Sequence, residues 1–235
     1  MRKSSELTIP LDGGDRTSAR LYAGDTALAA VLVLAHGAGA GQQSSFMVDF
    51  ANGVADRGAD VITFNFLYME KRRGAPDRAP ALESCYRAVV ARAAEVAGGR
   101  ALFIGGKSMG GRIATQIAAA DSRLPIAGLV LLGYPLHPPG QPDKPRDAHL
   151  PAIARPTLVI QGERDTFGTP DELRPVLSHM SPEPTLHVVP RGDHSFKVTK
   201  KDPGAQAALY AELQRTIADW IGVTASEGRR RARAT

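Results

Sequence analysis

Short apolar runs alternate along this chain with longer stretches in which apolar residues recur every three or four positions. The first pattern is typical of strands that are buried on both faces, and the second of amphipathic helices. Their alternation predicts βαβ units and therefore an α/β fold, a mostly parallel doubly wound sheet. The predicted parallel strands are residues 30–35, 60–66, 101–105, 128–133, 157–161 and 186–189.

The beginning of the chain predicts a different arrangement. Residues 6–11 and 17–22 flank the turn-prone run 12–15, which indicates an antiparallel hairpin at one end of the sheet. Apolar stripes then predict helices around residues 82–96, 113–117, 173–177 and 209–220, with Thr169 as the cap of the third.

Length and composition indicate one packed domain. The chain has 235 residues, 43% of them apolar and 23% charged, and we expect the domain to span residues 1–225. The net charge is +5, but four arginines near the end leave only +1 elsewhere. We therefore expect residues 226–235 to form a basic, flexible tail, and we expect no nucleic-acid partner. The four are Arg229, Arg230, Arg231 and Arg233.

Cysteine use and the distribution of apolar residues predict a cytoplasmic protein without a membrane partner. The single cysteine, Cys85, cannot form an intrachain disulfide, and its place on the apolar stripe of the helix around 82–96 indicates a packing role. The first ten residues lack the apolar run of a secretory signal. The longest apolar run, residues 27–35, is too short to cross a bilayer.

A G-x-S-x-G pentapeptide, residues 106–110, has Ser108 at its centre. The pentapeptide alone is a weak signal, but a predicted strand precedes it and a predicted helix follows it. That setting is typical of a nucleophile elbow, a sharp turn that exposes a reactive serine at the carboxyl end of a strand. Ser108 is therefore the candidate nucleophile.

Backbone N–H groups near Ser108 are candidates for an oxyanion hole. The Met109 N–H at the start of the helix is the first candidate donor. The glycine-rich loop 36–41 after the strand 30–35 offers the second, either the Ala38 or the Gly39 N–H. A phosphate-binding loop is the competing interpretation, but no Gly-Lys-Ser/Thr follows at the spacing of a nucleotide-binding loop.

An acid and a base follow two later strands. A serine hydroxyl needs a base to accept its proton, and the base needs a carboxylate to orient it. Asp165 follows the strand 157–161, His194 follows the strand 186–189, and the order serine, acid, histidine is typical of this fold. Glu163, in the same loop as Asp165, is the alternative acid. The other five histidines are expected to be structural.

We expect no cofactor and no metal, because a Ser-His-Asp triad needs neither and the histidines and the cysteine do not lie at ligand spacings. Aromatic residues after neighbouring strands, Phe66, Tyr68 and Tyr134, are the candidate pocket walls. Residues 71–73 (Lys71 to Arg73) either attract an acidic substrate or form a solvated loop. The proline-rich stretch 135–156 is too short for a cap domain but long enough to line a site mouth.

These motifs resemble the α/β-hydrolase superfamily over residues 6–220. The compact form without a large cap resembles the dienelactone-hydrolase-like branch, in which cysteine often replaces the serine. The sequence is more closely similar to a small bacterial hydrolase family whose domain recurs in a subunit of a eukaryotic histone acetyltransferase regulatory complex and in a testis-expressed relative. Residues 64–71, 105–112, 133–136 and 161–168 carry that likeness.

The resemblance implies a single-domain serine hydrolase that acts on a small-molecule ester, or alternatively on a thioester or amide, through an acyl-enzyme intermediate. Some members of the similar family resemble interaction domains. A non-catalytic protein-binding module is therefore the alternative function.

Overall fold

A computed structural model of the chain describes residues 4–198 and 203–233. Its centre is an eight-stranded sheet in the order β1-β2-β4-β3-β5-β6-β7-β8. β1 and β2 pair antiparallel, as do β2 and β4, and every later pair is parallel. The predicted α/β fold with an N-terminal antiparallel hairpin is thereby confirmed. The strands are β1 (Ser4–Pro10), β2 (Arg16–Tyr22), β3 (Ala30–Ala35), β4 (Asp60–Phe64), β5 (Ala101–Lys107), β6 (Gly128–Leu132), β7 (Thr157–Gly162) and β8 (Thr185–Val189).

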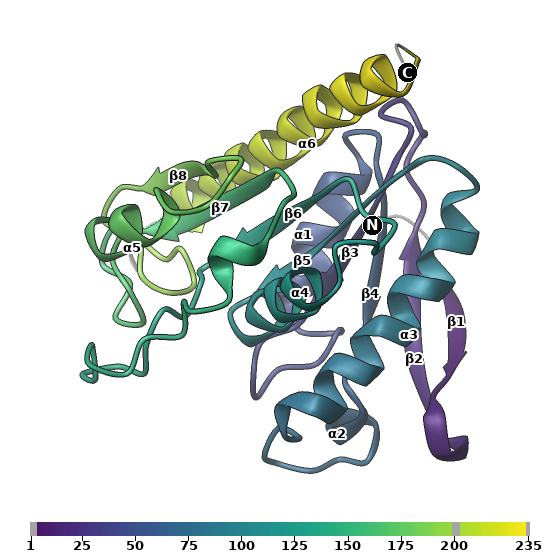
Figure 1. Cartoon of the computed structure of the whole chain (residues 1–235), viewed down its shortest axis with the longest axis horizontal. Helices are drawn as coiled ribbons and strands as arrows, with labels where there is room; N and C mark the ends of the chain where they lie inside the picture. Colours follow the sequence, from purple (N-terminus) through teal and green to yellow (C-terminus); the bar gives the residue numbers. More distant parts are fainter. Residues whose placement is uncertain (1–3, 199–202, 234–235) are drawn as a thin grey trace.

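Helices cover both faces of the sheet (Figure 1). α1 and α6 pack against each other on one face, and α3 and α4 pack against each other on the opposite face. Among the described residues, none of the helices combines the length and hydropathy needed to cross a bilayer. The helices are α1 (Ser45–Ala55), α2 (Leu67–Glu70), α3 (Ala79–Ala97), α4 (Met109–Ala120), α5 (Pro170–Leu177) and α6 (Pro203–Arg233), with 3-10 turns at Asp12–Gly14 and Leu150–Ala152.

The central strands are apolar along their whole length because both of their faces are covered. β3 shows this most clearly, since all six of its residues are buried and successive side chains point to opposite faces. Val31, Val33 and Ala35 join the core under α3 and α4, whereas Ala30, Leu32 and Leu34 join the core under α1 and α6.

Two strand ends differ from the prediction in ways that affect the later site. β4 ends at Phe64 rather than at residue 66, because the Asn65 side chain accepts a hydrogen bond from the Gln42 N–H at 2.9 Å and the chain then turns into α2. β5 continues to Lys107 and so carries the backbone directly to Ser108. The helix α1 was not predicted.

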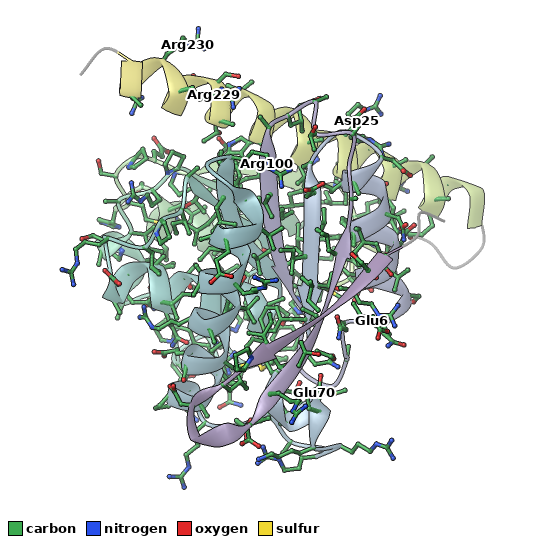
Figure 2. The ribbon with its side chains drawn as sticks, turned by 90° about the vertical axis from the view of Figure 1, so that its right-hand side faces the viewer. Glu6, Asp25, Glu70, Arg100, Arg229 and Arg230 are labelled. Carbon is green, nitrogen blue, oxygen red and sulfur yellow. The ribbon has the colours of Figure 1, made fainter. Side chains whose placement is uncertain are left out.

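The described part of the expected basic tail is helical, and its flexibility stays a prediction. α6 does not end near residue 225 but continues as a helix to Arg233, and its last turns, with Arg229 and Arg230, extend past the body of the domain (Figure 2). Among the residues whose burial the structure describes, Ala225 is the last buried one, and residues 227–232 are exposed. The segment is thus helical yet solvated. Residues 234 and 235 of the predicted tail lie outside the described ranges.

This exposure predicts that the end of α6 contributes little to stability. A chain that stops after Ala225 keeps every residue of α6 that the structure describes as buried, so its free energy of unfolding should change by less than about 1 kcal/mol. The matched variant Ile221→Ala removes a fully buried side chain and should lower it by about 2–5 kcal/mol. Urea denaturation followed by circular dichroism measures the free energy of unfolding of both variants. Equal losses of stability in the two would contradict the conclusion that the end of α6 contributes little.

Candidate active site

Ser108 occupies a strained turn between β5 and α4. Its backbone has φ +51° and ψ −116°, a conformation that residues with a Cβ rarely adopt. Hydrogen bonds fix both sides of the turn, since the Ser108 N–H donates to the Leu132 carbonyl at 3.0 Å and the Ser108 carbonyl accepts from the Arg112 N–H at 3.0 Å. The predicted elbow is therefore present as a strand, a turn and a helix.

The two glycines of the pentapeptide are required by close packing. A Cβ on Gly106 would lie 2.4 Å from the Ala35 carbonyl oxygen, and a Cβ on Gly110 would lie 2.5 Å from the same atom. Both distances are too short for a non-bonded contact. The atom in the way is a backbone oxygen, which cannot move aside as a flexible side chain could. The elbow therefore packs directly on the last residue of β3, and only glycine fits at these two positions.

The structure brings Ser108, His194 and Asp165 into one hydrogen-bonded chain. His194 Nε2 lies 2.8 Å from Ser108 Oγ, and His194 Nδ1 lies 2.7 Å from Asp165 Oδ2. Because an ionised carboxylate only accepts hydrogen bonds, Nδ1 carries the proton and Nε2 is left to accept from the serine hydroxyl. The imidazole is partly exposed, with 20% of its side-chain surface accessible, whereas the Asp165 side chain is fully buried.

Asp165 is held by three donors. Its Oδ2 accepts from Gln161 Nε2 at 2.9 Å as well as from His194, and its Oδ1 accepts from the Phe167 N–H at 2.9 Å. The alternative acid, Glu163, is turned away, because its carboxylate accepts from the Arg191 N–H. The contact with His194 thus distinguishes between the two acids in favour of Asp165.

Lys107, the residue before the serine, is a buried cation that the sequence did not single out. Its Nζ donates to the His194 carbonyl oxygen at 2.5 Å and lies 5.7 Å from the centre of the Phe196 ring. Burial lowers the pKa of Lys107 to about 8, although the carboxylates of Asp165 and Asp193 oppose this shift. The side chain therefore ties the backbone of the histidine loop to β5.

The loop after β3 is fixed by a buried neutral histidine. His36 Nδ1 contacts the Gly37 carbonyl at 2.8 Å, and its Nε2 accepts from the Phe66 N–H at 3.1 Å. Burial lowers the pKa of His36, which favours the neutral ring that this pattern needs. Ala38 faces the pocket beside Ser108. The Gly39 backbone lies by the Tyr68 hydroxyl instead. Burial raises the pKa of Tyr68, and the Gly39 backbone opposes this rise.

Ser108 and His194 open into a pocket of about 900 Å³, but its walls differ from the predicted ones. Phe66, Tyr68 and Tyr134 are at most 1% exposed and do not line it. They do follow strand ends as predicted, but they turn inward: the rings of Phe66 and Tyr68 pack edge-on against His36, and the Tyr134 hydroxyl donates to the Arg146 carbonyl. The aromatic walls are Phe46, Phe167 and Tyr210.

Sequence signals for these walls are weak. Phe46 belongs to the unpredicted α1, where its spacing of four from Phe50 is a helical signal, and the two rings stack 4.3 Å apart. Phe167 follows Asp165 by two residues, and its ring lies 4.3 Å from the His194 ring. Tyr210 is one turn before the apolar Leu213 on α6. Nothing in the sequence around it indicates that it faces the pocket.

Residues 71–73 do not line the pocket. Lys71 pairs with Asp15 at 2.7 Å, and Arg73 pairs with Asp77 at 2.8 Å, so the solvated-loop interpretation describes them better. The proline-rich stretch does reach the pocket, as expected, through Pro135 and Arg146.

Cys85 fills space in the core as predicted. It is 3% exposed, and burial raises the pKa of its thiol to about 12, so it remains a protonated thiol near neutral pH. Among residues 4–198 and 203–233, no three histidine, cysteine, aspartate or glutamate side chains gather as metal ligands would.

The buried Lys107 predicts a pH-dependent stability. The folded chain loses this proton near pH 8, whereas the unfolded chain keeps it to about 10.5, so the unfolded state binds more protons between these values. Stability from this group therefore rises with pH across that window, by roughly 3 kcal/mol, and Lys107→Met removes the effect.

Urea denaturation of the wild type and of Lys107→Met at pH 7.5, 9 and 10.5 measures this difference. The stability of the wild type relative to the variant should increase at each step. Parallel pH profiles for the two proteins would show that the lysine titrates normally in the folded state.

Comparison with known proteins agrees with this fold. A lidless α/β serine hydrolase from Xanthomonas campestris matches with a TM-score of 0.70 and 22% identity, over 93% of this chain and 95% of the other. A dienelactone hydrolase from Anabaena variabilis matches with a TM-score of 0.69 and 20% identity, over 91% and 95%. The esterase domain of a Rhodothermus marinus protein matches with a TM-score of 0.70 and 14% identity, over 94% and 98%.

The sequence itself matches a family model. The match covers residues 28–222, which include both elbow glycines and all three members of the hydrogen-bonded chain. This chain therefore belongs to the alpha/beta hydrolase domain family.

Proposed function

We propose that this protein is a serine hydrolase that cleaves carboxylic esters, with Ser108 as nucleophile, His194 as general base and Asp165 as the acid that orients it. The observation that carries the proposal is the pair of hydrogen bonds, 2.8 Å and 2.7 Å, that joins the three side chains at the floor of an open pocket. Thioesters and amides would follow the same route. The carbonyl of an ester is more reactive toward a nucleophile than that of an amide.

The mechanism follows from the proton positions. His194 Nε2 accepts the hydroxyl proton as Ser108 Oγ attacks the substrate carbonyl, and Asp165 stabilises the imidazolium that forms. Collapse of the tetrahedral intermediate breaks the bond to the leaving alcohol, which takes the proton from His194. Water then attacks the acyl-serine, again losing a proton to His194. The carboxylic acid leaves as the Ser108 oxygen takes that proton back from His194.

Two backbone N–H groups are suited to the oxyanion. Met109 is the first residue of α4, so its N–H has no acceptor in a preceding helical turn, and the helix dipole favours negative charge there. Of the two candidate second donors, Ala38 lines the pocket and Gly39 lies by the Tyr68 hydroxyl instead. We therefore assign Met109 and Ala38 as the donors.

The nucleophile is tested by hydrolysis of p-nitrophenyl butyrate. Ser108→Ala should lower kcat/KM by at least about 10⁴-fold with an unchanged circular dichroism spectrum, because the variant lacks the hydroxyl that His194 contacts. Ser45→Ala is the matched control, since Ser45 lines the same pocket and should keep activity within about threefold. A folded but inert wild type would favour the non-catalytic module.

The two carboxylates make a second test. Asp165→Asn should lower kcat by about 10³- to 10⁴-fold, because an amide in place of the carboxylate no longer stabilises the imidazolium. Glu163→Gln should change kcat less than about threefold, since its carboxylate accepts from the Arg191 N–H rather than from His194. Steady-state kinetics on the same ester measures both, and the reverse ranking would reassign the acid.

A further inference from the structure

Two arginines line the pocket and reach it from different elements. Arg112 belongs to α4, and its N–H donates to the Ser108 carbonyl at 3.0 Å, so Arg112 lies one helical turn beyond the serine. Arg146 comes from the proline-rich stretch between β6 and β7, whose backbone is anchored by the bond from the Arg146 N–H to the Leu136 carbonyl at 2.7 Å.

Neither guanidinium forms an ion pair with a carboxylate among the described residues, although the charge of Glu83 acts on Arg112 from beyond ion-pair distance. Both side chains are half-buried, and Arg112 Nε is buried without a hydrogen-bond partner within the same part of the chain. Burial first, and then the charge of Arg146, lower the pKa of Arg112. Two neighbouring cations that are partly desolvated and unpaired are unfavourable unless an anion binds between them.

The acidic residues of the pocket are engaged elsewhere. Asp77 Oδ1 pairs with Arg73 at 2.8 Å, and Asp49 Oδ2 accepts from Gln214 Nε2 at 3.2 Å. Lys107 is directed to the His194 carbonyl. Lys197 also lines the pocket, but its side chain is exposed. Arg112 and Arg146 are therefore the neighbouring, partly buried cations of the pocket that have no ion pair among the described residues.

We propose that Arg112 and Arg146 form a subsite for a carboxylate carried by the acyl part of the ester substrate. The inference rests on the proposed hydrolase function and narrows it to monoesters of short dicarboxylic acids. Guanidinium groups bind carboxylates through paired N–H···O bonds, and one helical turn from Ser108 leaves room for a spacer of a few methylenes. The leaving alcohol would lie near His194, where the Phe167 ring provides an apolar wall.

Two esters of similar length test this subsite. The p-nitrophenyl hemiester of glutaric acid carries the carboxylate, and p-nitrophenyl valerate ends in a methyl group instead. The wild type should prefer the hemiglutarate in kcat/KM by about 10-fold or more. Arg112→Met and Arg146→Met should each lower the ratio of the two kcat/KM values by about 10-fold, and Arg112→Lys should restore part of it.

Arg123→Met is the control, because that side chain is 94% exposed and outside the pocket; it should leave the ratio unchanged. Equal rates for both esters, with a ratio that no pocket variant alters, would overturn the subsite and leave the hydrolase intact. Calorimetry of hemiglutarate with Ser108→Ala measures binding without turnover. Adding Arg146→Met to Ser108→Ala should raise the Kd of hemiglutarate about 10-fold. Equal Kd values for the single and the double variant would also refute the subsite.

Discussion

The packing of the elbow on the Ala35 carbonyl is the contact on which the site depends. Gly106 and Gly110 lie so close to that oxygen that any side chain would displace the backbone. The contact holds Ser108 in a conformation that costs about 1–3 kcal/mol for a residue with a Cβ. The surrounding ladders from β3 and β6 supply the rigidity, because β5 is paired on both sides. A strained serine at the centre of a fully paired sheet is therefore stable.

The parallel sheet brings the other two groups to the serine. Carboxyl ends of parallel strands share one edge, so the loops after β5, β7 and β8 meet there although their residues are far apart in sequence. Buried polar contacts then fix their orientations: Gln161 and the Phe167 N–H hold Asp165, and Lys107 holds the backbone of His194. The same edge carries Arg112, so chemistry and recognition share a single pocket.

The sequence predicted those parts of the molecule that local patterns encode. Apolar strands, the elbow around Ser108 and the Thr169 cap, which forms a capping box with Glu172, all have local signals. The pocket walls did not, because the inward orientation of Tyr68 depends on the packing of the short helix α2 against His36, a contact between residues distant in sequence. α6 was underestimated because an arginine-rich segment can be both solvated and helical. Lys107 was overlooked because its partner is a backbone atom 87 residues away.

Activation of Ser108 by His194, which contacts its hydroxyl at 2.8 Å, underlies the proposed chemistry. Reaction with a fluorophosphonate, followed by intact mass measurement and peptide mapping, tests this activation, because such reagents modify activated serines. We expect a single phosphonate per chain, on the peptide that contains Ser108, and no adduct when His194 is replaced by alanine. An unmodified wild type, or an adduct on another pocket serine such as Ser45 or Ser195, would contradict it.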